Sequence, residues 1–216
     1  MSKEFLKRSF SSIILIPIAL FFIIEGSFLF NFFISICFLI SAYEWHMMTK
    51  KKKYNLYGFI FLIISFYSIY KLRNDVDSEY GYILLTTIIC VATDIGGYVF
   101  GKLFKGPKLT KMSPNKTYAG MIGGIFLSII TVNFYLDSMY WPYIKILSLD
   151  LFIFVILISL VSQSGDIIIS YFKRLSRIKD TGKIIPGHGG ILDRVDGMIF
   201  AFPFSYLIIL INAISI

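Results

Sequence analysis

The sequence predicts an all-α, polytopic integral membrane protein with about seven transmembrane helices. Hydrophobic residues make up 56% of the 216-residue chain and charged residues only 16%, whereas a soluble domain averages roughly 45–50% apolar residues. The apolar residues lie in runs of about twenty, the length an α-helix needs to cross about 30 Å of hydrocarbon. The runs lack the alternation of membrane β-strands, and lipid satisfies no backbone group left outside a helix.

The chain shows no internal repeat, low-complexity tract or linker. We therefore expect one membrane-embedded domain over residues 1–216, with N-terminal helices over 1–80 and a candidate catalytic core over 81–216. A tight turn is predicted at Glu25-Gly26, after the short first span. The predicted spans are 9–24, 28–46, 55–71, 81–101, 119–136, 151–172 and 197–215.

Basic residues predict the orientation. With the N-terminus in the cytoplasm, 18 of the 21 Lys and Arg residues fall in cytoplasmic segments, and only Lys71, Arg73 and Lys145 fall outside. This asymmetry follows the positive-inside rule. We therefore expect a cytoplasmic N-terminus, an external C-terminus and a cytoplasmic site in segments 102–118 and 173–196. We therefore attribute the net charge of +8 to interaction with the membrane surface rather than with a nucleic acid.

The segment after the sixth predicted span carries groups suited to phosphate. Lys173, Arg174 and Lys179 supply cationic donors, and arginine can bind phosphate with a planar fork. In Pro186-Gly-His-Gly-Gly190, the absence of side chains lets backbone N–H groups approach an anion closely. A simple lipid anchor would need basic residues but not this loop.

A pair of carboxylates follows the loop. Asp193 and Asp196 are three residues apart, so on a helix both project from one face. Mg²⁺ in proteins is commonly held by one or two carboxylates together with substrate phosphates. The pair therefore predicts a magnesium site at the membrane surface.

Two further acids lie inside predicted spans. Asp94 and Asp166 each lie about seven residues from the end of their span, roughly 10 Å below the same boundary at 1.5 Å per residue. A carboxylate in the apolar layer normally faces a polar cavity or a partner. We expect one shared site, with Asp166 as the better metal ligand because it leads into Ser170 and Lys173. The alternative is that each acid caps a helix or pairs with a lysine.

The segment Ser113-Pro114-Asn115-Lys116-Thr117 is predicted to start a helix, with Pro114 at its first position. Lys116 and Thr117 would then bind phosphate at a positive helix end. The sequence leaves open whether Glu44, at the end of the second span, is buried.

The polar segment resembles the phosphatidate cytidylyltransferase (CDP-diacylglycerol synthase) family. Asp94 to Lys102 and Ser113 to Thr117 are similar to two earlier blocks of that family, although Ala119 stands where the family commonly has Glu. The family pattern specifies thirteen positions over 27 residues, and this chain fills it with Ser170, Lys173, Arg174, Lys179, Asp180, Gly182, Pro186, His188, Gly189, Gly190, Asp193, Arg194 and Asp196.

The resemblance implies transfer of a cytidylyl group from CTP to phosphatidic acid in the inner (plasma) membrane of a bacterium. Mg²⁺, with a second cation as an open alternative, would be held by Asp166, Asp193 and Asp196. Basic residues including Arg194 would hold phosphates, and His188 would orient a phosphate or transfer a proton. A homodimer is an open alternative. The implied substrate-binding positions are Asp94, Ser113, Pro114, Lys116, Thr117, Ser170, Gly189 and Gly190.

Two other classes use membrane carboxylates. A lipid-alcohol kinase or CDP-alcohol phosphotransferase would also need Mg²⁺. A CDP-alcohol phosphotransferase would carry an Asp-Gly-x-x-Ala-Arg block, which this sequence lacks. A transporter would not need the His-Gly-Gly loop and more often shows an internal repeat.

Overall fold

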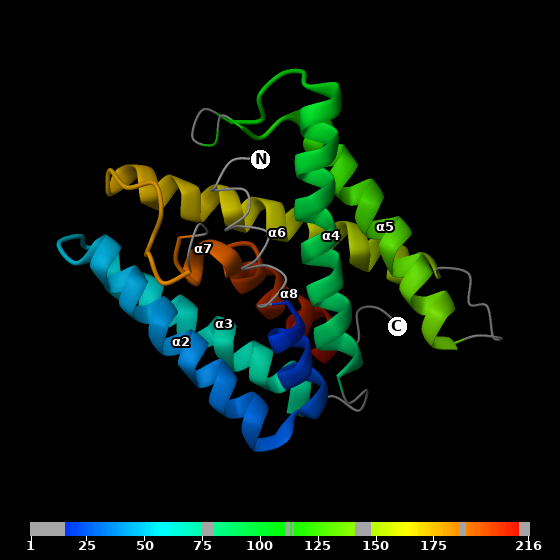
Figure 1. The fold of residues 1–216 in the computed structure, drawn as a ribbon, viewed down its shortest axis with the longest axis horizontal. Helices are drawn as coiled ribbons and strands as arrows, with labels where there is room; N and C mark the ends of the chain where they lie inside the picture. The colour runs from blue at the N-terminus through cyan, green and yellow to red at the C-terminus, as the bar shows by residue number, and fades with distance from the viewer. Residues whose placement is uncertain are drawn as a thin grey trace.

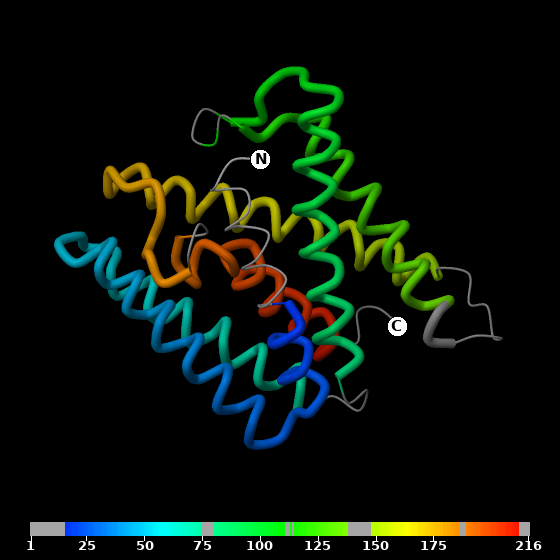
Figure 2. The backbone as a smooth tube through the Cα atoms, viewed as in Figure 1, coloured from blue at the N-terminus to red at the C-terminus, as the bar shows by residue number. Residues whose placement is uncertain are grey.

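The computed structural model describes residues 16–74, 80–110, 113, 115–140, 148–185 and 189–211, without the side chains of 138–140, and these form a helical assembly (Figure 1; Figure 2). A short helix, Ile16–Glu25, comes first. The labelled helices are α2 (Ser27–Thr49), α3 (Asn55–Asn74), α4 (Gly81–Phe104), α5 (Tyr118–Tyr140), α6 (Leu149–Leu175), α7 (Leu192–Val195) and α8 (Met198–Leu210).

The helices confirm the predicted all-α membrane architecture. Among the described residues, five helices (α2 to α6) are long and apolar enough to cross a membrane. Large apolar side chains such as Phe28, Leu39 and Phe134 are exposed on their outer faces, where lipid would surround them.

Two shorter helices stand where the first and seventh spans were predicted. Ile16–Glu25 and Met198–Leu210 are both apolar, but at 1.5 Å per residue α8 is only about 20 Å long, less than the hydrocarbon thickness of about 30 Å. The described residues therefore contain five full-length spans, and the predicted count of seven is not confirmed. The predicted ends at 9 and 215 lie outside the described residues.

The turn predicted at Glu25-Gly26 is present. Gly26 has a φ of +66°, in the left-handed region that glycine adopts readily. Arg73 of α3 donates hydrogen bonds from Nε to the carbonyl oxygen of Ile23 (2.7 Å) and from Nη2 to that of Ile24 (3.1 Å). These bonds satisfy carbonyl groups at the end of the first helix that have no partner within it.

The connections rich in polar residues gather at one end of the assembly. In Figure 1 the α2–α3 turn and the α6–α7 connection lie at the left and the α4–α5 connection lies at the top, whereas the start of α4 and the end of α5 lie toward the lower right. Segments 102–118 and 173–196 are thus on the same side of the protein, as the sequence predicts.

Helix α8 packs against α3, α4 and α6. Its polar contacts include a hydrogen bond from Ser65 Oγ to the carbonyl oxygen of Ile199 (2.7 Å) and a contact of 2.8 Å between Thr86 Oγ1 and Ser205 Oγ. Interhelical hydrogen bonds between small side chains are a common means of joining membrane helices. They fix α8, and with it the α7 segment that precedes it.

Glycines allow α4 and α5 to lie in close contact. A Cβ atom added to Gly96 would lie 2.6 Å from the carbonyl oxygen of Gly123 and 2.9 Å from Cα of Gly124. The neighbouring Gly97 is different, because its Cβ would lie 3.7 Å from the carbonyl oxygen of Gly120, an ordinary contact distance.

This difference predicts opposite outcomes for two adjacent substitutions. We expect Gly96→Ala to destabilise the protein by about 1–3 kcal/mol, because backbone cannot yield to the new methyl group as a side chain can. Gly97→Ala should cost nothing, since alanine favours the helix over glycine. Thermal unfolding of both variants in detergent tests this, and equal melting temperatures would contradict the close packing.

Candidate functional site

One face of α6 carries the first part of the site. Asp166, Ser170 and Lys173 are spaced four and three residues apart, which places them on one side of a helix. Ser170 Oγ donates to Asp166 Oδ1 at 3.3 Å, and both Ser170 and Lys173 are buried. The C-terminal third of this apolar helix therefore presents a polar stripe toward the protein interior.

Lys173 joins this stripe to the carboxylate pair after the loop. Its Nζ lies 3.0 Å from Asp193 Oδ1 and 3.8 Å from Asp196 Oδ2. Asp193 is in the single turn of α7 and Asp196 follows that turn directly. The two carboxylates do share a face, as their spacing predicts, and one largely buried ammonium group contacts both.

Asp193 accepts three hydrogen bonds, one of them from the charged side chain of Lys173. Besides Lys173, the backbone N–H groups of Thr181 (2.7 Å) and Gly190 (3.0 Å) donate to Asp193 Oδ2. Burial raises the pKa of Asp193, but these hydrogen bonds and the Lys173 charge outweigh burial, so the pKa lies below its ordinary value. The anion that the glycine loop approaches in this structure is thus a carboxylate of the protein.

Asp196 has the opposite electrostatic environment. Burial raises its pKa well above the ordinary value, and the nearby carboxylates of Asp166 and Asp94 raise it further, against the lowering effect of Lys173 and of a hydrogen bond from Gly197 N. Like charges close to one another disfavour ionisation. Asp94, Asp166 and Asp196, from three separate elements, therefore lie within electrostatic reach of each other.

The α4–α5 connection adds a second lysine. Lys116 Nζ lies 2.5 Å from Asp166 Oδ2 and donates to the carbonyl oxygen of Gln163 at 3.2 Å. Both contacts are with α6, so the α4–α5 connection reaches the helix that also carries Ser170 and Lys173. Asp166 also pairs with a lysine, Lys116, which is the alternative that the sequence left open.

The predicted helix start at Ser113-Pro114 is wrong. Helix α5 begins at Tyr118, and Thr117 caps it by accepting the N–H of Gly120 at 3.1 Å. Before the cap the chain folds back, with Leu109 N donating to the carbonyl oxygen of Lys116 (2.8 Å). Thr117 lies three residues before an N–H that has no partner within the helix, so it caps α5 in place of Ser113. Lys116 therefore lies just before the positive end of the helix.

Pro114 and His188 lie outside the described residues. Arg174 donates to the carbonyl oxygen of Ile178 at 3.3 Å, and Ser113 accepts the N–H of Lys116 through its carbonyl oxygen at 3.0 Å. Four more predicted site residues have exposed positions: Asp94, Lys179, Asp180 and Arg194.

Sequence reasoning left Glu44 undecided, and the structure buries it to 2% exposure. The carboxylate of this α2 residue accepts hydrogen bonds from Thr181 Oγ1 (3.1 Å), Ile191 N (3.1 Å) and Leu192 N (2.8 Å). The signal available in the sequence was an acid at the end of an apolar span, which normally requires a partner.

The carboxylates can be compared with what Mg²⁺ requires. Among the residues that the structure describes, no three Asp, Glu, His or Cys side chains gather as a metal centre. Hydrogen bonds or ion pairs engage both oxygens of Asp193 and both oxygens of Asp166. Asp166 and Asp196 lie close enough to repel each other. Two carboxylates completed by substrate phosphates fit the usual magnesium environment, so the donor set fits the ion without a third protein ligand.

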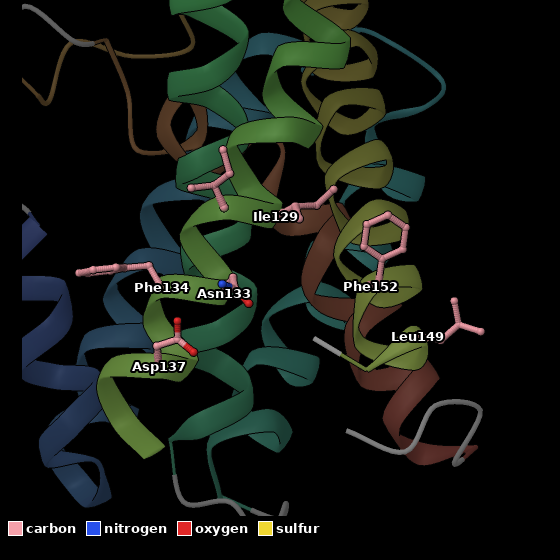
Figure 3. A pocket seen from close by; sticks show the side chains of 7 residues that line it. Ile129, Asn133, Phe134, Asp137, Leu149 and Phe152 are labelled. Carbon is pink, nitrogen blue, oxygen red and sulfur yellow. The ribbon is translucent and has the colours of Figure 1, made fainter. Parts of the chain in front are cut away.

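A cavity of about 670 Å³ lies elsewhere, between α5 and α6. Figure 3 shows Asn133 and Asp137 of α5 facing this space, with Leu149 and Phe152 on α6. Leu149 and Lys173 are 24 residues apart on α6, about 36 Å along the helix axis at 1.5 Å per residue. This cavity is therefore not part of the lysine–carboxylate site.

Membrane-length helices with a buried lysine–carboxylate cluster at one end define an integral membrane protein with a charged site suited to phosphate. The chain belongs to the cytidylyltransferase family, because the model of that family matches residues 56–212.

Named bacterial relatives support this membership. The chain is 34% identical over 210 residues to a phosphatidate cytidylyltransferase of Rickettsia felis, covering 93% of this chain and 90% of that protein. The phosphatidate cytidylyltransferase of Rickettsia typhi is 40% identical over 165 residues (74% and 72%). That of Bacillus subtilis is 36% identical over 155 residues, covering 69% of this chain and 55% of the relative, so the chain spans about half the length of the latter.

Proposed function

We propose that this chain is a nucleotidyltransferase that converts CTP and phosphatidic acid to CDP-diacylglycerol and pyrophosphate in phospholipid biosynthesis. Membership of the cytidylyltransferase family and the names of the Rickettsia relatives support this activity. The single structural observation that carries it is the pair of lysines, Lys116 and Lys173, held against carboxylates at one end of membrane-length helices.

In the proposed reaction a phosphate oxygen of phosphatidic acid attacks the α-phosphorus of CTP. The new P–O bond forms as the bond to the β-phosphate oxygen breaks, and pyrophosphate leaves with that electron pair. Such transfer depends chiefly on positioning and charge neutralisation. The proposed phosphate ligands are the ammonium groups of Lys116 and Lys173, with exposed Arg174, Lys179 and Arg194 at the entrance.

Other predicted residues have supporting roles in the proposal. Ser170 fixes Asp166 by hydrogen bonding, and Thr117 directs the α5 N-terminus toward the site. Asp94 contributes negative charge near Lys116 and Arg194. Asp180, His188, Gly189 and Gly190 remain predicted site residues on the strength of the family pattern.

Mg²⁺ is the proposed cofactor, held by Asp166 and Asp196 with Asp193 as the group that orients Lys173. When bound, the ion would neutralise the charge that develops on the phosphates. It would also relieve the repulsion between these two carboxylates.

We also propose that the N-terminus and the site face the cytoplasm and the C-terminus lies outside. The support is that 18 of the 21 Lys and Arg residues lie on the proposed inner side. Such a site would meet soluble CTP and bilayer-bound phosphatidic acid at one surface. A homodimer remains a separate proposal, tested by the mass of the purified protein in detergent.

The activity is tested with purified protein, phosphatidic acid vesicles, Mg²⁺ and each of four labelled nucleoside triphosphates. We expect labelled liponucleotide from CTP, release of pyrophosphate and dependence on Mg²⁺. Transfer of label from γ-labelled ATP to a lipid, with none from CTP, would instead identify a lipid kinase. Absence of product with every nucleotide, from a protein that remains folded, would contradict the proposal.

A further inference from the structure

The buried carboxylate of Glu44 belongs to α2, far in sequence from the polar motifs and outside the residues 56–212 that the family matches. Glu44 Oε1 accepts the N–H of Ile191 at 3.1 Å. Glu44 Oε2 accepts the N–H of Leu192 at 2.8 Å and the hydroxyl of Thr181 at 3.1 Å. Each of these donors lies in the segment 181–192, which precedes and begins α7.

Gly182 and Gly190 leave room for this carboxylate. A Cβ atom on Gly190 would overlap the carboxylate group of Glu44, and one on Gly182 would lie 2.5 Å from Glu44 Oε1. Both glycines belong to the motif recognised in the sequence. Their small size is therefore needed here for contact with a side chain from α2.

Thr181 and Gly190 connect Glu44 to the site. The hydroxyl of Thr181 donates to Glu44 while the N–H of the same residue donates to Asp193 Oδ2 at 2.7 Å. Gly190, packed against Glu44, also donates its N–H to Asp193 at 3.0 Å. Asp193 in turn holds Lys173 at 3.0 Å.

We propose that Glu44 is a positioning residue that sets the geometry of Asp193 and Lys173 through its contacts with Thr181 and with residues 190–192. The first long helix is then part of the catalytic unit. Glu44 itself does not contact substrate, because it is buried and both of its oxygens are used by this segment. The inference rests on the proposed function for its activity readout only.

Glu44→Gln is the informative variant because it preserves size and removes an acceptor. Both carboxylate oxygens face N–H donors, so the amide NH₂ must face a donor in either orientation, which leaves a buried N–H unpaired. We expect kcat to fall about 10- to 100-fold. This is the change in rate that corresponds to the free-energy cost of one unsatisfied buried donor. KM for CTP should change less than about threefold, because the outer basic residues are untouched.

Ser41→Ala is the matched control. Ser41 is buried on the same helix, one turn before Glu44, and its hydroxyl has no hydrogen-bond partner among the residues that the structure describes. Its loss should leave kcat within about twofold of the parent protein, since no hydrogen bond is removed.

Amide hydrogen exchange separates positioning from a general loss of stability. In Glu44→Gln, the amides of Ile191 and Leu192 should exchange at least about tenfold faster, while amides in the middle of α6 exchange at the parental rate. Equal acceleration everywhere would show a merely structural role and overturn the proposal, as would parental kcat and parental exchange at Ile191 and Leu192.

Thr181→Val decides the matter if Glu44→Gln does not fold. It removes only the hydroxyl that bonds Glu44 and keeps the N–H that bonds Asp193. We expect a loss in kcat of about 3- to 10-fold, the effect of one hydrogen bond, and a parental kcat would overturn the proposal. Failure of the proposed function is distinguishable, because the parent protein would then make no product while the exchange pattern would still report on Glu44.

Discussion

Asp196→Asn is expected to lower the formation of CDP-diacylglycerol at least about 100-fold, the scale on which loss of one charged stabilising group acts. Asparagine keeps the shape of the side chain and an oxygen to accept the N–H of Gly197, which now bonds Asp196 Oδ1 at 3.0 Å. The variant loses one of the two carboxylates, Asp166 and Asp196, that are proposed to hold Mg²⁺. It should therefore fold but fail in catalysis, as product formation and thermal unfolding in detergent can show together.

Asp193→Asn is the matched comparison and should differ in stability. Asp193 accepts the Lys173 ammonium on one oxygen and two backbone N–H groups on the other. Asparagine cannot accept on both sides, so we expect loss of activity together with about 3 kcal/mol of stability, as for a broken buried ion pair. Normal turnover by both variants would remove these carboxylates from the mechanism.

Lys116→Met should also lower activity at least about 100-fold, because it removes a proposed phosphate ligand and leaves the Asp166 carboxylate without its charge partner. Lys116 contacts Asp166 at 2.5 Å and the Gln163 carbonyl oxygen at 3.2 Å. The substitution therefore also releases the α4–α5 connection from α6. Initial rates over a range of CTP concentrations measure the effect.

Lys108→Met is the control for that substitution. Lys108 is an exposed lysine of the same connection, where its backbone pairs with Thr117. Removing an exposed charge should change activity little, since solvent already screens it. Equal losses in both variants would mean that the general positive charge of this connection matters, rather than the contact between Lys116 and Asp166.

Much of the architecture could be predicted from local sequence. The ends of α3, α4 and α6 fall within a few residues of the predicted spans, because apolar runs are bounded by charged or turn-forming residues. The shared face of Asp193 and Asp196 also follows from helical spacing, and one lysine contacts both. The helix start at Ser113-Pro114 was mispredicted because Thr117 offered a competing cap four residues later.

The partners of the polar groups could not be predicted in the same way. The loop ending at Gly190 has the composition of an anion-binding turn, but composition does not say which anion. In the structure the N–H of Gly190 bonds Asp193 and the next two N–H groups bond Glu44. Those pairings join residues up to 148 positions apart, and no local pattern specifies them.

By itself the sequence determined that this chain is helical, embedded in a membrane and equipped with a basic, carboxylate-bearing segment, because hydropathy and motif spacing are properties of neighbouring residues. The tertiary structure decided which charges meet: Lys116 with Asp166, Lys173 with Asp193 and Asp196, and Glu44 with the segment that carries them. The physical reason is that a buried carboxylate must find its donors wherever the packing of helices places them.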